Sequence, residues 1–445
     1  MKRDEFSGFF GVLVATVGSA VGLGNLWRFP YLVGQNGGAA FILVYLAFVL
    51  IICLPIAVSE FIIGRRTRAN TVKAFQILAP RTPWSAIGVV GVIAAFSILA
   101  FYTVVGGWTM DYLFRSIIHL FSKPDISSLE SQFTTMVTSP VRPIVWTVVF
   151  VLFSAFIVMC GIKKGIEKYS RIMMPFLFLM VVILMVRSLT LPGAEKGIAF
   201  LVKPDFSKIN TSVILAALGQ AFFSLSLGMG CLITYGSYIP NKENLTRVSF
   251  STAMSDTLFA MLAGLAIMPA VFAFGISPQE GPGLVFIVLP RIFAQIPLGN
   301  YFAVMFFVIL LIAAVTSVIS LLEVVTAYVT ERLKVKRKYA VGVIALLVTV
   351  CASFSSLSQG VLSDVKIFGK TIFDFFDYLS ANILLPLGGL FIVLFVGWYM
   401  KKALVYDEFT NQGTLKGTLF RAYYFIIRYV APVAIAIVFL DLILR

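Results

Sequence analysis

The residues best suited to bind an ion or a polar solute lie in a glycine-rich stretch, residues 18–30, inside a long apolar run. Three glycines precede Asn25, and no charge occurs in residues 6–27. Each glycine weakens a helix by about 1 kcal/mol relative to alanine. In hydrocarbon, irregular backbone persists only inside protein or beside a polar cavity, so a break here would free backbone groups for binding. Close helix packing through Gly18 and Gly22 explains the same pattern, and the stretch alone leaves both readings open.

The other polar side chains in apolar runs do not form a catalytic set. Asp256 lies at membrane depth, where an unpaired carboxylate is costly and a functional role is expected. Asp111 lies in a similar run, without a partner that the sequence identifies. Four cysteines are far apart and lack metal-ligand spacing, so we expect buried free thiols; they are Cys53, Cys160, Cys231 and Cys351. We therefore expect no enzymatic activity and no organic cofactor.

The composition is typical of a helical membrane protein. Of 445 residues, 60% are apolar and 12% are charged, and the mean hydropathy is +0.98. No segment has the composition of a separate soluble domain, so we expect one transmembrane domain over residues 1–445. The net charge of +15 is spread over short loops, which indicates a lipid bilayer as partner and no nucleic acid.

Apolar runs of membrane length predict eleven spans. They cover residues 8–34, 38–63, 85–119, 143–161, 170–190, 211–238, 246–275, 299–329, 340–354, 376–400 and 420–443. Basic residues gather in alternate connections, which places the N-terminus in the cytoplasm by the positive-inside rule. Eleven spans then put the C-terminus outside, and we expect the inner (plasma) membrane as the location.

The sixth span shares the weakness of the first. Residues 219–230 read Gly-Gln-Ala-Phe-Phe-Ser-Leu-Ser-Leu-Gly-Met-Gly within an uncharged run. Five spans separate the starts of the two weak helices, so two five-helix units would enter the membrane from opposite sides. We expect repeat one at 8–190, repeat two at 211–400 and an additional helix at 420–443. Such inverted units, each opening with a broken helix, indicate a secondary transporter with its site at the midplane.

Four motifs occur in order along the chain. They are residues 22–30 with 36–38, residues 224–230, Thr316-Ser317 with residues 321–323, and Asp377 before residues 382–389. Together they resemble the neurotransmitter:sodium symporter family, in particular its bacterial amino-acid transporters, over nearly the whole chain. The resemblance implies an all-α polytopic membrane protein with a LeuT-type 5+5 inverted repeat and discontinuous first and sixth helices. It also implies sodium-coupled amino-acid uptake by alternating access.

The resemblance implies two sodium sites built from oxygens that replace the ion's hydration shell. The first would use the carbonyls of Ala20 and Ser224, the Asn25 amide oxygen, the Ser224 hydroxyl and a group of the seventh span. Ungapped alignment gives Ser255 there, with Asp256 beside it. The second would use the carbonyls of Gly18, Val21 and Ala313 with the hydroxyls of Thr316 and Ser317. Bonding of these hydroxyls to their own preceding turn is the structural alternative. We further hypothesise that Asp256 supplies the fixed negative charge that chloride provides in animal relatives.

The resemblance also implies an amino-acid site between the two breaks. The Leu23 and Gly24 amides and the Tyr102 hydroxyl would bind the carboxylate, and the carbonyls of Ala20, Phe223 and Ser226 the ammonium. Monoamine-transporting relatives carry an aspartate where this chain has Gly22, so an amino acid is favoured. Ser224 also belongs to this site, and side-chain specificity would come from Ser19, Ile98, Phe223, Met229, Ser317 and Leu321. This lining favours a hydrophobic or aromatic amino acid.

Residues on either side of the site resemble the family's gates. Arg28 and Asp377 would form the outer pair, with Phe223 and Tyr102 as the lid beneath it. Arg3 and Glu331 would form the inner pair, with Phe6 where relatives often carry tryptophan. Glu60 and Glu323 would hold the unwound part of the sixth span. Gly165 and Pro175 match a Gly-x9-Pro motif that lets the fifth helix unwind in bacterial relatives, although an ordinary proline near a helix end explains the pair equally.

Two other functions remain compatible with these residues. One is sodium-independent amino-acid exchange, and the other is a channel or sensor that keeps the fold without coupling. The sequence leaves the choice between monomer and homodimer open.

Overall fold

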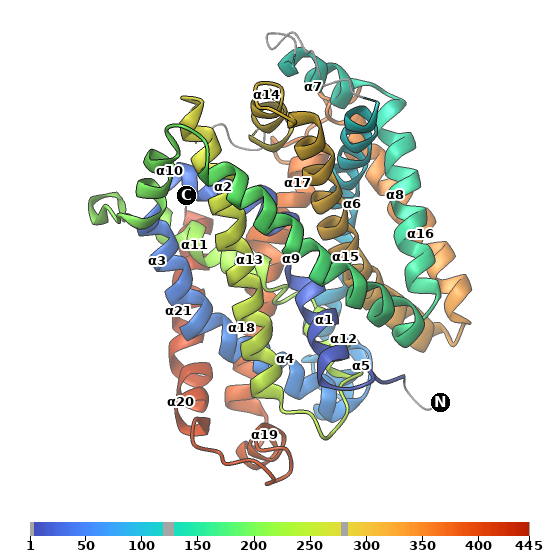
Figure 1. Ribbon diagram of the computed structural model, residues 1–445. Helices are drawn as coiled ribbons and strands as arrows, with labels where there is room; N and C mark the ends of the chain where they lie inside the picture. The colour runs from blue at the N-terminus through green and yellow to red at the C-terminus, as the bar shows by residue number, and fades with distance from the viewer. Residues whose placement is uncertain (1–3, 119–128, 277–283, 445) are drawn as a thin grey trace.

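A computed structural model describes residues 4–118, 129–276 and 284–444 of the chain. Within them the protein is a bundle of helices, with one isolated β-bridge between Ile367 and Lys370 (Figure 1).

In the described parts of the chain, nine helices are long and apolar enough to cross a membrane. Three of them are single α-helices of 29 to 35 residues: α6 (Ser85–Ile117), α13 (Leu245–Ala273) and α15 (Gly299–Leu333). Two are shorter, α8 (Arg142–Met159) and α16 (Arg337–Leu357). The other four contain π-helical turns and combine α3 (Ala39–Phe48) with α4 (Leu54–Thr67), Ile162–Glu167 with α9 (Lys168–Leu189), α17 (Ile372–Tyr378) with α18 (Leu385–Leu394), and α20 (Phe420–Phe425) with α21 (Ala431–Leu444).

The first predicted span is broken where the glycines lie. Helix α1 (Phe9–Ala20) ends before Val21, which is extended at φ −72° and ψ 104°. A π-helical turn at Gly24–Arg28 then leads into α2 (Phe29–Gln35), and the two halves are bent by 48°. The predicted discontinuity of the first helix is confirmed.

The sixth predicted span is also broken. Helix α11 (Thr211–Ser224) is separated from α12 (Cys231–Gly236) by residues without regular structure. Within this break Ser226, Gly228 and Gly230 have φ of 55°, 76° and 77°. A Cβ on Gly228 would lie 2.3 Å from the Leu385 carbonyl oxygen, so glycine is required there. The predicted second discontinuity is confirmed, whereas the count of eleven spans stays a prediction because neither half of this pair has membrane length.

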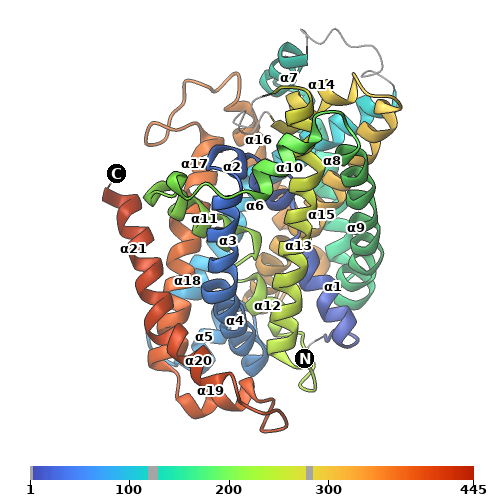
Figure 2. The ribbon, with the colours of Figure 1, turned by 60° about the vertical axis from the view of Figure 1, so that its left-hand side comes forward.

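The two broken helices occupy the centre of the bundle (Figures 1 and 2). Helix α1 packs against α9, α13 and α15, and α15 packs along α6. Both breaks are thereby surrounded by protein, which is the condition for irregular backbone at membrane depth.

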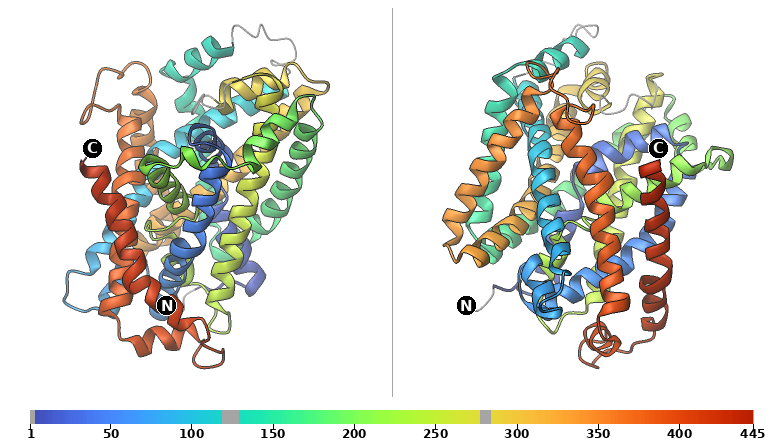
Figure 3. Two further views of the ribbon diagram at one scale, coloured as in Figure 1. Left: turned by 90° about the vertical axis from the view of Figure 1, so that its left-hand side faces the viewer. Right: turned by 180° about the vertical axis from the view of Figure 1, so that it is seen from behind.

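Short helices and the chain termini distinguish the two ends of the bundle (Figures 1 to 3). One end, which we call the α14 end, carries α7 (Leu129–Thr138), α10 (Ala194–Val202), α14 (Leu289–Phe293) and the last described residues of α21. The other, the α19 end, carries α5 (Thr71–Leu78), α19 (Lys402–Phe409) and the first described residues. The described chain therefore starts and finishes at opposite ends, as an odd number of spans requires.

Asp111 has two partners that the sequence did not reveal. Its buried carboxylate forms ion pairs of 2.7 Å with Arg115, one turn later in α6, and with Arg142 at the start of α8. A buried carboxylate is tolerated when it is paired in this way, and the cluster joins α6 to α8.

The cysteine expectation holds only in part. All four cysteines are free, and Cys53 and Cys231 are buried, but Cys160 is exposed and Cys351 is partly exposed. The prediction of burial was wrong for Cys160 because this residue follows the last turn of α8, and Cys351 lies on a partly exposed face of α16.

Candidate functional site

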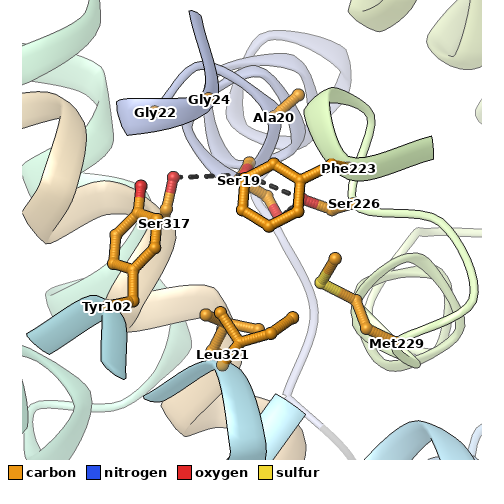
Figure 4. Close-up of a pocket in the computed structure, with 11 residues that line it drawn as sticks. Ser19, Ala20, Gly22, Gly24, Tyr102, Phe223, Ser226, Met229, Ser317 and Leu321 are labelled. Atoms are coloured by element: carbon orange, nitrogen blue, oxygen red, sulfur yellow. Dashed lines mark hydrogen bonds between the residues drawn. The ribbon is translucent and has the colours of Figure 1, made fainter. Parts of the chain in front are cut away.

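A cavity of about 320 Å³ lies between the two helix breaks. Its lining comes from α1 and the following break, α6, the end of α11 and the break after it, and α15. All 11 lining residues are among those expected to contact a substrate: Ser19, Ala20, Gly22, Gly24, Ile98, Tyr102, Phe223, Ser226, Met229, Ser317 and Leu321 (Figure 4). Leu23 and Ser224 were expected as well and lie just behind this lining.

Gly22 lets three elements meet at the cavity. A Cβ at this position would lie 2.2 Å from the Ser317 hydroxyl oxygen and 2.7 Å from the Tyr102 hydroxyl oxygen. Neither distance is compatible with a real contact, so any side chain here would displace both hydroxyls. The glycine is therefore explained by close approach of α6 and α15 to the α1 break.

The break in the first span exposes a backbone donor to the cavity wall. The Leu23 amide donates a hydrogen bond of 2.8 Å to the Tyr102 hydroxyl oxygen. Tyr102 is fixed by its place in the middle of α6 and is 3% exposed. A hydroxyl and a backbone amide thus converge at one side of the cavity, where they suit a carboxylate.

A chain of serines begins beside Tyr102 at Ser317 and continues along the cavity through Ser19 to Ser226. The Ser226 hydroxyl donates to the Ser19 carbonyl at 2.9 Å, and the Ser317 hydroxyl lies 3.4 Å from the same carbonyl (Figure 4). Ser19 in turn donates to Ser320 at 2.9 Å. Sequence reasoning missed Ser320, although its spacing of three residues from Ser317 on one helix places both on the same face. The remaining wall is apolar, through Ile98, Met229 and Leu321.

Asp256, Asn25 and Ser224 form a buried polar cluster next to the cavity. The Asn25 Nδ2 donates to Asp256 Oδ1 at 2.8 Å and to the Asp256 carbonyl at 3.2 Å. The Ser224 hydroxyl donates to Asp256 Oδ2 at 2.7 Å. Asn25 Oδ1 accepts from the Gly22 amide at 3.1 Å, so a rotation of the Asn25 amide would turn this oxygen towards the cluster. The donor set consists of oxygens and one carboxylate, which suits a small hard cation.

The structure places Asp256, and not Ser255, at this cluster. Ser255 is only half-buried, and its hydroxyl joins none of the hydrogen bonds described above. Successive helical side chains point about 100° apart, so only one of the two neighbours can face Asn25. Of the two residues that were expected there, Asp256 joins the cluster, and its role as a cation ligand stays a prediction.

Two residues of this cluster were not anticipated. Gln220 Nε2 donates to the Gly24 carbonyl at 2.9 Å, and the Tyr45 hydroxyl lies 3.5 Å from Asp256 Oδ2. Gln220 was visible as the only amide in the uncharged part of α11, whereas nothing in the sequence separates Tyr45 from other tyrosines in spans.

Of the residues expected at a second cation site, Gly18 and Thr316 lie close together, and the Thr316 hydroxyl is bonded within its own helix. A Cβ on Gly18 would lie 3.5 Å from the Thr316 Cβ and 3.4 Å from the Ser170 hydroxyl oxygen, so α1, α15 and α9 meet there. The Thr316 hydroxyl donates to the carbonyls of Ile312 and Ala313, the local bonding that the sequence left as an alternative. Ser317 instead lines the cavity, and Val21, whose carbonyl was expected at the second site, is itself the extended residue at the break.

The predicted outer pair is not in direct contact. Arg28 lies over the Phe223 ring, with 4.7 Å between the guanidinium carbon and the ring centroid. Among the described residues no ion pair within 4 Å joins it to Asp377, and its Nη1 is buried without a hydrogen-bond partner. The pair is therefore open in this conformation, and Phe223 separates Arg28 from the cavity.

Phe6, which was expected beside the inner pair, is packed against two tyrosines. Phe6 is 2% exposed, meets the rings of Tyr235 and Tyr238 edge-on, and donates its amide to the Tyr238 carbonyl at 3.0 Å. Arg3, the expected partner of Glu331, lies outside the described residues. Glu331 accepts a hydrogen bond of 2.8 Å from Asn70 Nδ2 at the start of α5.

Both additional carboxyl groups were expected to hold the unwound part of the sixth span, and only Glu60 contacts it. Glu60 Oε1 accepts the Gly228 amide at 2.8 Å, within the break. Glu323 accepts the Tyr238 hydroxyl at 2.7 Å, just after α12, and pairs with Arg337 at the start of α16. Each carboxyl group thus ties the central broken helix to a neighbouring span.

Comparison with known proteins agrees with this arrangement. The chain matches the sodium:neurotransmitter symporter family over residues 3–128 and 125–445. The sodium-dependent transporter YhdH of Bacillus subtilis is 40% identical over 442 residues, which cover 99% of this chain and 98% of that protein. A sodium-dependent transporter of Haemophilus influenzae is 37% identical with the same coverage.

More distant and structural relatives extend the comparison. The sodium- and chloride-dependent GABA transporter 2 of the mouse is 28% identical over 93% of this chain and 75% of that protein. The crystal structure of MhsT in complex with L-phenylalanine superposes with a TM-score of 0.93 at 45% identity, over 99% of this chain and 100% of the other.

Proposed function

Because the chain belongs to the sodium:neurotransmitter symporter family and has a LeuT-type fold, we propose that it carries an amino acid into the cell together with sodium ions. The observation that carries this proposal is the cavity between two broken helices, with a carboxylate-binding side at Leu23 and Tyr102 and the oxygen cluster around Asp256 next to it. The fold unit is a single transmembrane domain with repeats at 8–190 and 211–400 and an additional helix at 420–443.

The proposed substrate is a hydrophobic or aromatic amino acid. Ile98, Met229 and Leu321 offer an apolar wall, and the thioether of methionine adapts to large side chains. The binding of L-phenylalanine by MhsT supports this class. Its carboxylate would contact the Leu23 and Gly24 amides, and its ammonium the carbonyls of Ala20, Phe223 and Ser226.

The proposed first sodium ion binds among Asp256, Ser224, Asn25 and the Ala20 carbonyl. The second binds among Gly18, Val21, Ala313, Thr316 and Ser317, where the Thr316 hydroxyl would turn away from its own helix. Both ions lie next to the helix breaks, so sodium binding and the closure of the broken helices are coupled.

We infer that the α19 end faces the cytoplasm, since the basic connections around α5 and α19 lie there. Arg28 and Asp377 then form the outer gate and Phe6 and Glu331 belong to the inner closure. The described conformation, with the outer pair apart and Phe6 buried, would be closed towards the cytoplasm.

Uptake into proteoliposomes tests the proposal directly. Purified full-length protein should accumulate radiolabelled L-phenylalanine, L-leucine or L-tryptophan only with an inward sodium gradient, in a saturable and electrogenic manner. Uptake that persists without sodium would instead identify an exchanger, and unsaturable current would identify a channel.

Tyr102→Phe should weaken amino-acid binding by about tenfold, since it removes one hydrogen bond to a charged carboxylate. Sodium affinity should change much less because Tyr102 lies outside the Asp256 cluster. Equilibrium binding of radiolabelled L-phenylalanine at saturating sodium measures the effect. The same substitution at Tyr301, which is 68% exposed, is the control and should leave binding unchanged.

Pro175→Ala should slow the release of sodium to the cytoplasm by about tenfold. Pro175 lies inside the continuous helix α9, one residue after Met174, whose sulfur lies beside Gly18; proline removes one backbone hydrogen bond there, and alanine would restore it. Time-resolved sodium efflux after a jump to sodium-free buffer measures the rate. Pro143→Ala, at the first turn of α8 where proline fits a helix, is the control; equal rates in all three proteins would contradict unwinding.

Gly165→Ala tests the same idea less cleanly. A Cβ at Gly165 would lie 2.2 Å from the Ile157 carbonyl oxygen, so alanine would disturb packing against α8 as well as stiffen the helix.

A further inference from the structure

A second cavity lies at the α14 end, away from the site described above. It is bounded by α9, α13, α14 and the start of α15, and its space, including the part open at the rim, is about 400 Å³. Its walls are apolar and mostly buried, with Leu184, Ile267, Ile292 and Phe306 between 1% and 6% exposed. It is larger than the cavity between the helix breaks and shares no lining residue with it.

Two polar groups face this apolar space. Ser188, near the end of α9, is 3% exposed, and its hydroxyl has no hydrogen-bond partner. Its neighbour Arg187 is half-buried at the rim, lies 6.0 Å from the Phe302 ring and donates to Thr190 at 3.2 Å. A buried hydroxyl without a partner costs stability, so a ligand that bonds to it would recover that loss.

The charge of the lining selects the kind of ligand. None of the lining residues is acidic, and no ion pair within 4 Å joins Arg187 to a described carboxylate. The cavity therefore offers a cation and a hydroxyl but nothing for an ammonium group, which argues against a second amino-acid site. An anionic head on an apolar body fits this lining.

The surroundings of the rim indicate that such a ligand comes from the bilayer. Ile183 and Val186 on α9 are 44% and 53% exposed, and Tyr301 on α15 is 68% exposed. These side chains form an apolar surface that faces lipid in a membrane protein, close to the end of the helix where headgroups lie. An amphiphile held in the membrane would meet the rim with its head at the level of Arg187.

We propose that this cavity binds a single-chain carboxylate amphiphile, a fatty acid in chemical terms. Its chain enters the apolar space from the rim, Arg187 pairs with the carboxylate, and the Ser188 hydroxyl is a second donor. The occupant touches α9 of the first repeat and α13 to α15 of the second, so it bridges the two halves of the protein.

Photo-crosslinking tests this site on the full-length protein in nanodiscs of phosphatidylcholine. The probe is a palmitate that carries a diazirine in its chain, and labelled peptides are mapped by mass spectrometry. Labels should fall on residues 184–191, 266–270 and 289–306, and unlabelled palmitate should compete. The alcohol of the same chain length should compete at least about tenfold less well, since a hydrogen bond to a charged group is lost.

Three variants locate the interaction. Arg187→Gln should lower labelling by about tenfold. Ala270→Phe should abolish it by filling the space, with sodium-dependent phenylalanine binding as the check on folding. Arg291→Gln removes a neighbouring arginine that does not line the cavity, and labelling should stay at the level of the unmodified protein.

Several results would overturn the proposal. They are labels outside these segments, equal loss in Arg187→Gln and Arg291→Gln, or equal competition by alcohol and carboxylate. The same labelling is repeated in nanodiscs that contain phosphatidylglycerol. If this lipid reduces labelling by the palmitate probe as strongly as unlabelled palmitate does, the cavity binds a phospholipid chain instead.

Discussion

Gly22→Ala is expected to lower sodium-dependent amino-acid uptake by about two orders of magnitude. The added methyl group would lie 2.2 Å from the Ser317 hydroxyl oxygen and 2.7 Å from that of Tyr102, so both must leave the positions from which they face the cavity. The Leu23 amide would lose its alignment with Tyr102 as well. Initial uptake rates and equilibrium binding of L-phenylalanine in the same preparation measure the loss.

Two further variants test whether Gly22→Ala lowers uptake by disturbing the binding site or by destabilising the fold. Gly219→Ala places a methyl group in α11 where no atom lies within 4 Å, so uptake should be preserved and thermal stability unchanged or slightly higher. Ser317→Ala combined with Gly22→Ala removes the closest clash, and the double variant should bind better than Gly22→Ala alone. If Gly219→Ala were as damaging as Gly22→Ala, the steric explanation would be wrong.

Asp256→Asn should lower the apparent affinity for sodium by about 100-fold. The substitution preserves the size of the side chain but removes a buried negative charge that a bound cation would face at close range. Transport at low sodium should fall accordingly and partly recover at high sodium. The sodium dependence of uptake, measured at saturating amino acid, gives the shift.

Ser255→Ala is the matched control because it lies next to Asp256 on α13 but outside the cluster. Its sodium dependence should equal that of the unmodified protein. If Asp256 supplies the fixed negative charge, replacement of chloride by gluconate should leave uptake by the unmodified protein unchanged. A requirement for chloride would refute that role of Asp256. An effect of Ser255→Ala on sodium affinity as large as that of Asp256→Asn would show instead that Ser255 is a sodium ligand.

Much of the fold could be predicted because lipid imposes simple rules. The apolar run that begins at residue 38 and the helix Ala39–Thr67 nearly coincide, since a spanning segment must be apolar and helical. The predicted ends of the spans were less accurate. The span predicted at 340–354 covers only the middle of the helix Arg337–Leu357, because the first turn of this helix is basic and lies outside the apolar run. Short helices such as α5 and α10 were missed because they carry no membrane-length signal.

The positions of the two breaks could also be predicted, since glycine, serine and asparagine destabilise a regular membrane helix and are expected there mainly where they form a binding site. What the sequence could not provide was the angular position of neighbouring side chains. Ser255 and Asp256 are equivalent in a one-dimensional alignment, but a rotation of about 100° between them decides which one meets Asn25 and Ser224. The partners of Asp111 were hidden for the same reason, as Arg142 belongs to a different helix.

By itself, then, the sequence determined the class of protein, the discontinuous helices and the residues of the cavity, because each is encoded in local composition and in motifs. Only the tertiary structure decided which of those residues touch. It brought Gly22 against Ser317 and Tyr102, separated Arg28 from Asp377 by more than an ion-pair distance, and enclosed a second cavity beside Ser188. Such contacts depend on the packing of helices that are far apart in the chain, and no local pattern records them.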